Sequence, residues 1–148
     1  MIQKYRYKTL LIVGFSLLFG TSYASDVEKE KRWAKQVVDS VMVGDAEWLK
    51  AGNSKILSLY TENNTEKAFG GAIILHGSGV HPNWDQIIRP LRSQLPDYGW
   101  QTLSLQLPVL ANEAEYKDYI PLFKDVAPRI NAGVKFLKAK GITNIVIV

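Results

Sequence analysis

The sequence contains no cysteine and only two histidines. Without cysteine the chain has no disulfide, no thiolate metal site and no cysteine nucleophile, so an exported form would depend on its core alone. His76 and His81 have no cluster of carboxylates beside them, and a spacing of five residues in a loop is not a metal-ligand pattern. We therefore expect no metal and no cofactor, and histidines that brace or line a site.

Residues 9–20 form an apolar run that is too short and too interrupted for a membrane span, which needs about 20 apolar residues. Lys4, Arg6 and Lys8 precede this run, and Ser22-Tyr23-Ala24 follows it. A basic head, a short apolar middle and small residues before the cut are typical of a secretory signal peptide. We expect residues 1–24 to be removed after Ala24, leaving no stable membrane span, with the product in the periplasm or secreted.

The basic charge of the chain lies mostly in that first segment. Residues 1–24 hold three of the 18 basic residues and none of the 14 acidic ones, so the remainder carries 15 basic and 14 acidic side chains. A nearly neutral mature chain gives no basis for nucleic-acid binding. We expect a small-molecule or acyl substrate as the partner instead.

Hydrophobic spacing predicts a helix, a hairpin, and then alternating strands and helices. An amphipathic helix is expected over 26–43, capped by Ser25 or Asp26 and ended by Gly44, with its inner face formed by Ala34, Val37, Val38, Val41 and Met42. Strands at 46–50 and 56–60 flank a four-residue turn and predict an antiparallel hairpin. The alternation that follows predicts a parallel sheet with right-handed crossovers, through a strand at 72–75, a helix at 84–95, a strand at 100–107, a helical stretch at 119–140 and a strand at 142–148.

Prolines and polar residues refine the two later helices. Asn83 is a good N-cap for the helix at 84–95, whose inner face is expected to be Ile87, Ile88, Leu91 and Leu95. Pro90 predicts a kink or a later start of this helix. Pro128 is expected to be the first-turn proline of a second helix within 119–140, with Phe123, Val126, Ile130, Val134 and Leu137 facing inward.

The glycine loop at 76–79 is the strongest candidate site. It follows a short apolar strand, and the carboxyl ends of strands are where open α/β sheets bind ligands. Dinucleotide and P-loop fingerprints fail, because Pro82 occupies the third glycine position and no Gly-Lys-Ser/Thr occurs. A His-Gly-x-Gly loop can instead supply a backbone donor for an oxyanion hole. The donor would be the N–H of Ser78, with Gly77 and Gly79 shaping the turn and His76 bracing it.

Three stretches together resemble a bacterial family of unknown function within the α/β-hydrolase superfamily. They are Leu75-His76-Gly77-Ser78-Gly79-Val80-His81-Pro82-Asn83-Trp84, Pro90-Leu91-Arg92, and residues 99–108, which end in Leu-Gln-Leu-Pro. The resemblance runs from about Gly44 to the end. It implies the α/β-hydrolase fold, export to the periplasm and a hydrolase activity, and no particular substrate.

In that fold a Gly-x-Ser-x-Gly elbow carries the nucleophile, followed by an acid and a histidine. Residues 144–148 look like the strand before the elbow, but the motif occurs nowhere in the chain and no histidine follows His81. A triad built on Ser78 and His81 would not match the order of nucleophile, acid and histidine in this fold. We expect residues 44–148 to be the N-terminal part of an α/β-hydrolase-like domain, truncated before the elbow and inactive alone, behind the helix in residues 25–43. His81, Trp84 and Gln106 are further candidates for lining the site.

Two other functions remain open from the sequence. One is a small, non-catalytic periplasmic binding module that holds a ligand with the loop His76–Trp84, although such a module is expected to end in a polar tail or a covered strand rather than in Ile-Val-Ile-Val. The other is an interaction protein that binds a partner through the helix at 26–43, although that helix mixes both charges on its polar face, which favours packing on its own domain.

Overall fold

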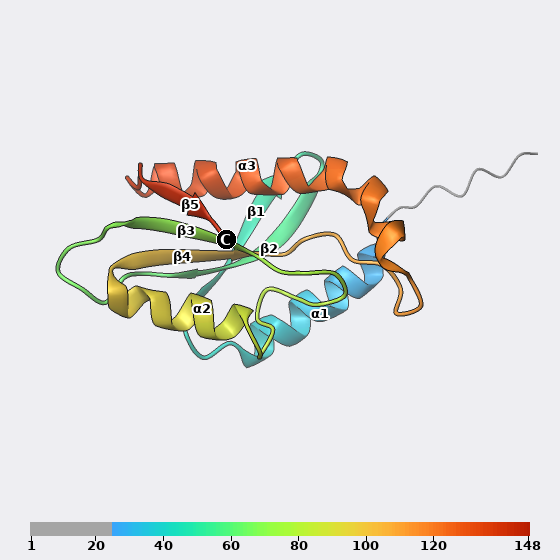
Figure 1. The fold of residues 1–148 in the computed structure, drawn as a ribbon, viewed down its shortest axis with the longest axis horizontal. Helices are drawn as coiled ribbons and strands as arrows, with labels where there is room; N and C mark the ends of the chain where they lie inside the picture. The colour runs from blue at the N-terminus through green and yellow to red at the C-terminus, as the bar shows by residue number, and fades with distance from the viewer. Residues whose placement is uncertain (1–24) are drawn as a thin grey trace, which may run out of the picture.

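The computed structural model describes residues 25–148 and is built around one sheet of five strands (Figure 1). The strands lie in the order β1-β2-β4-β3-β5, and β3 pairs in parallel with β4 and β5, whereas β1-β2 and β2-β4 are antiparallel. The predicted order of helix, hairpin and alternating strands and helices is therefore confirmed. The bounds of the strands are Asp45–Ala51 (β1), Ser54–Thr61 (β2), Gly70–Leu75 (β3), Trp100–Leu105 (β4) and Ile145–Ile147 (β5).

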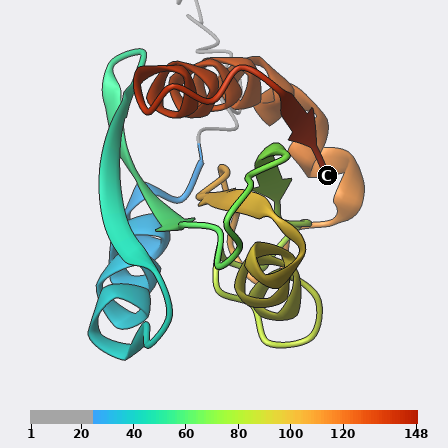
Figure 2. The same cartoon turned by 90° about the vertical axis from the view of Figure 1, so that its left-hand side faces the viewer.

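Helix α3 (Phe123–Ala139) covers one face of the sheet, and α1 (Val27–Ser40) and α2 (Ile88–Gln94) lie on the other (Figures 1 and 2). The alternation of side chains along β2 produces this layering. Ile56 and Tyr60 join the core under α3, and Leu57 and Leu59 pack against Ala34 and Val37 of α1. Helix α1 thus packs on its own sheet, as its mixed charges predicted.

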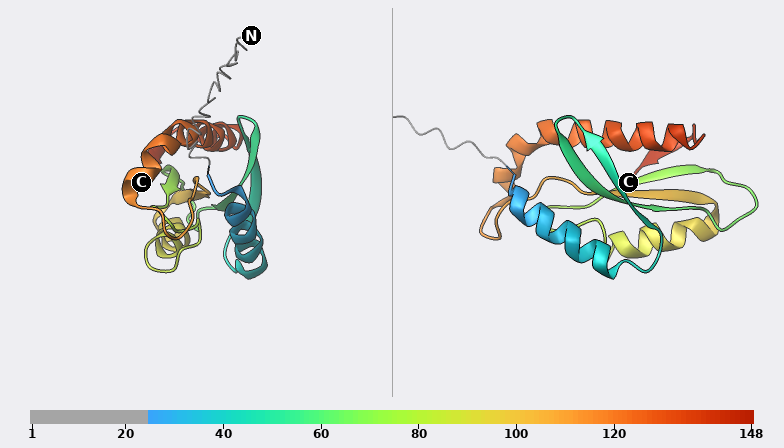
Figure 3. Two further views of the ribbon diagram at one scale, coloured as in Figure 1. Left: turned by 90° about the vertical axis from the view of Figure 1, so that its right-hand side faces the viewer. Right: turned by 180° about the vertical axis from the view of Figure 1, so that it is seen from behind.

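The hairpin β1–β2 runs from the α3 side of the molecule towards α1 (Figure 3). Its turn is two residues, Gly52-Asn53, rather than the four expected, because Ala51 and Ser54 already pair with each other. Gly52 has φ +60°, which fits the first central position of a type II′ turn, where glycine carries no steric cost. The tip of the hairpin reaches Pro128 on α3.

Helix α1 begins as predicted and ends earlier. The Asp26 carboxylate accepts the N–H of Lys29 at 2.9 Å as the N-cap, but the chain turns extended at Val41, three residues before Gly44. Met42 lies beyond the helix and is 92% exposed, and Val38 is exposed within it, so the predicted inner face is too wide. Lys29 and Glu30 are buried in their place.

Helix α2 begins at Ile88, so the predicted start at Trp84 is wrong. The Asn83 side chain does not cap a helix. It accepts a hydrogen bond from Arg92 Nε at 2.8 Å, and the Arg92 guanidinium also donates to the Val43 carbonyl at 2.6 Å. The later start places Pro90 in the first turn, where its missing N–H breaks no helical bond. Ile87 lies outside the helix and is exposed.

Helix α3 runs through Pro128, so the predicted break there is wrong. A 3-10 segment, η2 (Tyr116–Leu122), leads directly into it. Pro128 and the residue one turn before it are both exposed, and water can satisfy the carbonyl that loses its helical partner. Leu137 is buried and Val134 packs against the core as expected, whereas Phe123 is exposed and Arg129, Ala132 and Gly133 complete the buried face. At Gly133 a Cβ would lie 3.1 Å from Leu105 Cδ1, so glycine lets α3 approach β4 closely.

The central strand β4 is buried on both faces and stops at Leu105, two residues before the predicted end. Its polar side chains Thr102 and Ser104 donate to the carbonyls of Arg92 and Pro82 at 2.7 and 2.8 Å. At one edge of the sheet β5 pairs with β3, and its residues Val146 and Ile147 are more than a third exposed. Within residues 25–148, no helix combines the length and apolarity that a membrane crossing requires.

Candidate functional site

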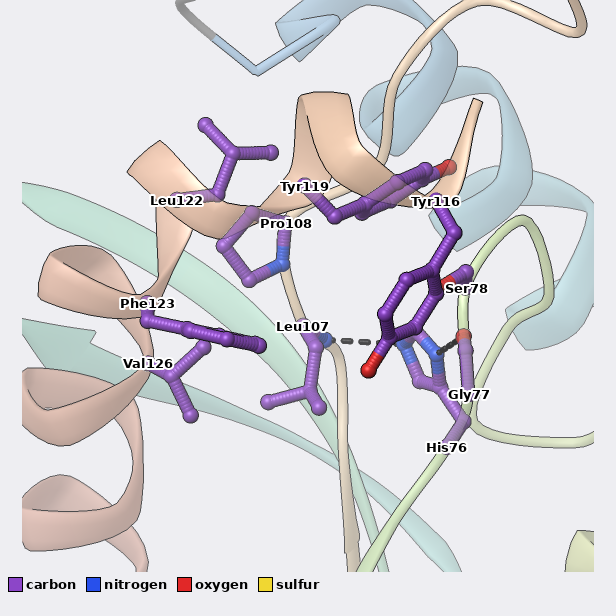
Figure 4. A pocket seen from close by; sticks show the side chains of 10 residues that line it. All are labelled: His76, Gly77, Ser78, Leu107, Pro108, Tyr116, Tyr119, Leu122, Phe123 and Val126. Atoms are coloured by element: carbon purple, nitrogen blue, oxygen red, sulfur yellow. Dashed lines mark hydrogen bonds between the residues drawn. The ribbon is translucent and has the colours of Figure 1, made fainter. Parts of the chain in front are cut away.

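The candidate site lies where β3 and β4 end side by side. These strands are parallel and in register, with Leu75 paired to Leu105, so the loops that leave them emerge at the same edge of the sheet. The loop His76–Gly79 and the segment after Leu105 therefore meet (Figure 4). This is the place at which open α/β sheets bind ligands.

The imidazole of His76 joins these two loops. His76 Nε2 accepts the backbone N–H of Leu107 at 2.9 Å, and Nδ1 donates to the carbonyl of Gly77 at 2.9 Å (Figure 4). An amide can only donate and a carbonyl can only accept, so the ring is neutral and carries its proton on Nδ1. Burial lowers the pKa of His76 to about 4, which keeps this form at neutral pH. Both ring nitrogens are occupied, so His76 is a brace and not a general base in this arrangement.

Beside the brace is a pocket of about 270 Å³, which we call the His76 pocket. Its lining carries no carboxylate, ammonium or guanidinium group and is dominated by aliphatic and aromatic side chains. Tyr116 and Phe123 are 75% and 58% exposed and form part of its open rim. The pocket therefore suits an uncharged, apolar group. Its lining is His76, Gly77, Ser78, Leu107, Pro108, Tyr116, Tyr119, Leu122, Phe123 and Val126 (Figure 4).

The glycine loop at the pocket keeps backbone donors available. Among residues 25–148 no hydrogen bond occupies the N–H of Ser78, and residues 77–79 are exposed. Gly79 has φ +70°, a conformation that non-glycine residues rarely adopt, whereas Gly77 has open space where a side chain would be. Gly77 and Ser78 are the residues of this loop that line the pocket after His76.

His81 and Trp84, predicted to line the same site, lie in a separate aromatic cluster. The His81 ring makes edge contacts with Trp33 of α1 and with Trp84, at centroid distances of 5.6 and 5.4 Å. Its Nδ1 accepts the N–H of Asn83 at 3.2 Å, and partial burial lowers its pKa. Neither residue belongs to the lining of the His76 pocket. His81 therefore packs against α1 through Trp33, and Trp84 packs against His81.

Gln106 was expected to line the site, and the structure places its side chain elsewhere. Gln106 Nε2 donates to the Glu30 carbonyl at 2.8 Å, and Oε1 accepts the N–H of Leu57 at 3.4 Å. The side chain is buried beneath α1 and does not line the His76 pocket.

Residues of η2 form one wall of the pocket, and none of them is among the site residues predicted from the sequence. The spacing of Tyr116, Tyr119 and Phe123 could have indicated this wall, because residues at i, i+3 and i+7 lie on one side of a helix. In the part of the chain that the structure describes, no three His, Cys, Asp or Glu side chains are grouped to hold a metal.

Comparisons with known proteins agree with this geometry. Residues 24–120 match the family described as "Protein of unknown function (DUF3530)". No curated protein matches the chain. An alpha-beta serine hydrolase homologue from Coxiella burnetii has a TM-score of 0.52 at 14% identity, over 72% of this chain and 51% of its own. A lidless α/β serine hydrolase from Xanthomonas campestris has the same TM-score at 10% identity, over 72% of this chain and 50% of its own.

At these identities the structural similarity shows the fold alone, and the chain spans about half the length of both hydrolases. The expected resemblance to a family of unknown function with this fold is confirmed. The chain has an α/β-hydrolase-like sheet and belongs to the DUF3530 family.

Proposed function

We propose that this chain supplies the oxyanion loop and an apolar acyl pocket to a serine ester or acyl hydrolase of the α/β-hydrolase type. The observation that carries the proposal is the loop Gly77–Gly79, whose Ser78 N–H has no partner among the described residues and which lines an apolar pocket at the end of β3. A substrate carbonyl would place its oxygen at this donor and its acyl chain among Leu107, Phe123 and Val126.

The environment of the loop favours this chemistry. Negative charge that develops on a carbonyl oxygen is stabilised most by fixed donors in a site of low polarity. The lining of the pocket provides low polarity, and the His76 brace fixes the loop without contributing a charge.

We place the nucleophile and its base outside these 148 residues. His76 has both ring nitrogens engaged, His81 lies away from the pocket, and no Gly-x-Ser-x-Gly occurs in the sequence. The chain on its own would therefore bind an apolar ester without turning it over.

The test is hydrolysis of p-nitrophenyl butyrate by the product of the complete encoding reading frame, read past the codon for Val148. We expect turnover by the longer product and none by residues 1–148. Ser78→Pro removes the donor N–H and should lower kcat by about 10²–10³-fold, whereas the matched control Ser78→Ala keeps the N–H and the activity. Equal activity of the Ser78→Pro and Ser78→Ala variants would refute the oxyanion role. A reading frame that stops at Val148 would refute the proposal that the nucleophile and its base lie outside these 148 residues.

The second candidate is a non-catalytic binding module that uses the same pocket. One observation favours it, since the pocket is lined mainly by apolar side chains and its one histidine has both ring nitrogens engaged, which suits binding without turnover. The expected binding loop is narrower than proposed from the sequence, because only His76, Gly77 and Ser78 of residues 76–84 line the pocket. Tight binding of an apolar carboxylic ester without turnover, by the complete product, would select this function.

Export remains part of the proposal. The predicted signal peptide, residues 1–24, lies outside the described residues. The test is fractionation of cells that express the intact gene, followed by N-terminal sequencing of the product. A mature chain that starts at Ser25 in the periplasm or medium supports export, and an uncleaved cytoplasmic chain refutes it.

A further inference from the structure

The residues that follow β4 connect the candidate site to the N-terminal helix. We call Gln106–Leu110 the exit segment, since β4 ends at Leu105. Leu107 in this segment donates the N–H that His76 accepts, and Leu107 and Pro108 line the pocket. Any group that places the exit segment therefore also places the His76 ring.

Helix α1 and the residue before it hold the exit segment at three points. The N–H of Asp26 donates to the Val109 carbonyl at 2.7 Å, and Lys29 Nζ donates to the Leu110 carbonyl at 2.7 Å. The third contact is the bond from Gln106 Nε2 to the Glu30 carbonyl, at 2.8 Å. Two of the three use carbonyls of the exit segment, which are buried and need donors.

A buried ion pair completes this attachment directly before Leu107. Arg129 of α3 binds both carboxylate oxygens of Glu30, at 3.0 and 3.3 Å, and the two side chains are only 7% and 11% exposed. The same Arg129 Nη1 also donates to the carbonyl of Gln106 at 3.0 Å. A buried ion pair is weak evidence of stabilisation, because desolvation offsets much of its attraction. Its planar geometry does fix three elements relative to one another, namely α1, α3 and the exit segment.

We propose that Glu30 and Arg129 are positioning residues for the site. They fix the carbonyl of Gln106, which sets the direction of the Leu107 N–H, and this N–H holds the ring of His76 and with it the glycine loop. The inference relies on the proposed function only in treating that loop as an oxyanion loop. The mechanical link from the ion pair to His76 does not depend on it.

The test is ¹⁵N NMR of the His76 ring in the purified protein and in the double variant Glu30→Met/Arg129→Leu. Apolar replacement of both partners leaves no unpaired buried charge, so we expect the variant to fold, with a melting temperature lowered only by the loss of the donor to the Gln106 carbonyl. The carbonyl of Gln106 loses its donor, and the pKa of His76 should rise from about 4 towards its ordinary value of 6.5. Part of this rise comes from loss of the Arg129 charge, which itself lowers the pKa of His76, so the charge-retaining variant Arg129→Lys decides whether positioning contributes. The amide signals of Gly77–Gly79 should shift with it.

Two further variants separate loss of the ion-pair geometry from a general loosening of α1. Arg129→Lys keeps the charge opposite Glu30 but lacks the planar fork, and should give an intermediate change in His76. Val37→Ala is the matched control, since it loosens α1 against Leu57 and Leu59 without touching the ion pair. Unchanged His76 signals in both Arg129 variants, or an equal change in Val37→Ala, would overturn the proposal. Loss of the oxyanion role of Ser78 with a responsive His76 would refute the proposed function and leave the positioning intact.

Discussion

The His76 brace makes the stability of the protein depend on pH in a predictable direction. The ring is buried and neutral, and protonation would turn Nε2 from an acceptor into a donor facing the N–H of Leu107. Burial lowers the pKa from 6.5 to about 4 in the folded protein, whereas the unfolded chain keeps the ordinary value. Because the unfolded chain binds the proton more readily, this stabilisation is complete above pH 6.5 and is lost as the pH falls towards 4.

The magnitude follows from the two pKa values. Each pH unit between them corresponds to about 1.4 kcal/mol, so the full contribution is about 3 kcal/mol and the loss at pH 5 is about 2 kcal/mol. Carboxylates also titrate in this range, so the parent must be compared with a variant that lacks only the imidazole. In His76→Gln the amide oxygen can still accept the Leu107 N–H but does not titrate.

The assay is urea unfolding of the parent and of His76→Gln at pH 7.5, 6.0 and 5.0. We expect the free energy of unfolding of the parent to fall more steeply than that of the variant, by about 2 kcal/mol between pH 7.5 and 5.0. His81→Gln is the matched control. His81 is only half-buried and Asp85 opposes the lowering of its pKa, so the corresponding difference should be smaller. Parallel curves for the parent and His76→Gln would refute the assignment of His76 as a buried neutral brace.

Three other predictions concern the core, a turn and the pocket. Leu105→Ala removes a fully buried side chain between α3 and the sheet and should cost about 2–5 kcal/mol in urea unfolding, whereas Ile147→Ala, at a site 54% exposed, should cost less than about 1 kcal/mol. Gly44 has φ +74° and a Cβ there would lie 2.3 Å from the Tyr60 carbonyl, so Gly44→Ala should lower the free energy of unfolding by at least about 1–3 kcal/mol. Phe123→Ser should weaken binding of an apolar ester probe without lowering the melting temperature, because this ring lines the pocket and is 58% exposed. The control is Ile120→Ser, which lies outside the pocket lining. Equal binding of the probe by the two variants would count against the acyl pocket.

The order of elements could be predicted because hydrophobic spacing reports burial directly. Runs rich in β-branched residues or leucine marked β2, β3, β4 and β5, and alternation along β2 matches the two cores that it separates. Helix boundaries failed where tertiary contacts override local signals. Asn83 has the chemistry of an N-cap, but a buried guanidinium nine residues away takes its side-chain oxygen. Pro128 has the chemistry of a helix start, but at an exposed position the helix tolerates the lost bond.

Within the site, the part that could be predicted is the part that is local in sequence. His76-Gly77-Ser78-Gly79 follows its strand directly, and the bracing role expected of His76 agrees with the bonds from its ring. The partner of that brace, Leu107, is 31 residues away and offers only a backbone N–H, which no residue type reveals. The burial of the Gln106 side chain could not be predicted either, because its partner is also a backbone group far away in the sequence. A glutamine at a strand end indicates either a ligand contact or a buried amide, and α1 decides the outcome by supplying the Glu30 carbonyl.

The contacts of α1 change what the N-terminal helix means for the site. A helix with mixed surface charge in front of an α/β domain suggests an accessory element. Besides the apolar Ala34 and Val37, however, α1 buries two charged residues, Lys29 and Glu30. Burying such groups costs free energy unless each is paired, and here each is paired to the exit segment or to the arginine that holds it. A helix required only for hydrophobic cover would not need them. The arrangement is the one expected if α1 is an integral support of the loop that carries Leu107, so removal of residues 25–40 should alter the His76 signals as well as the stability.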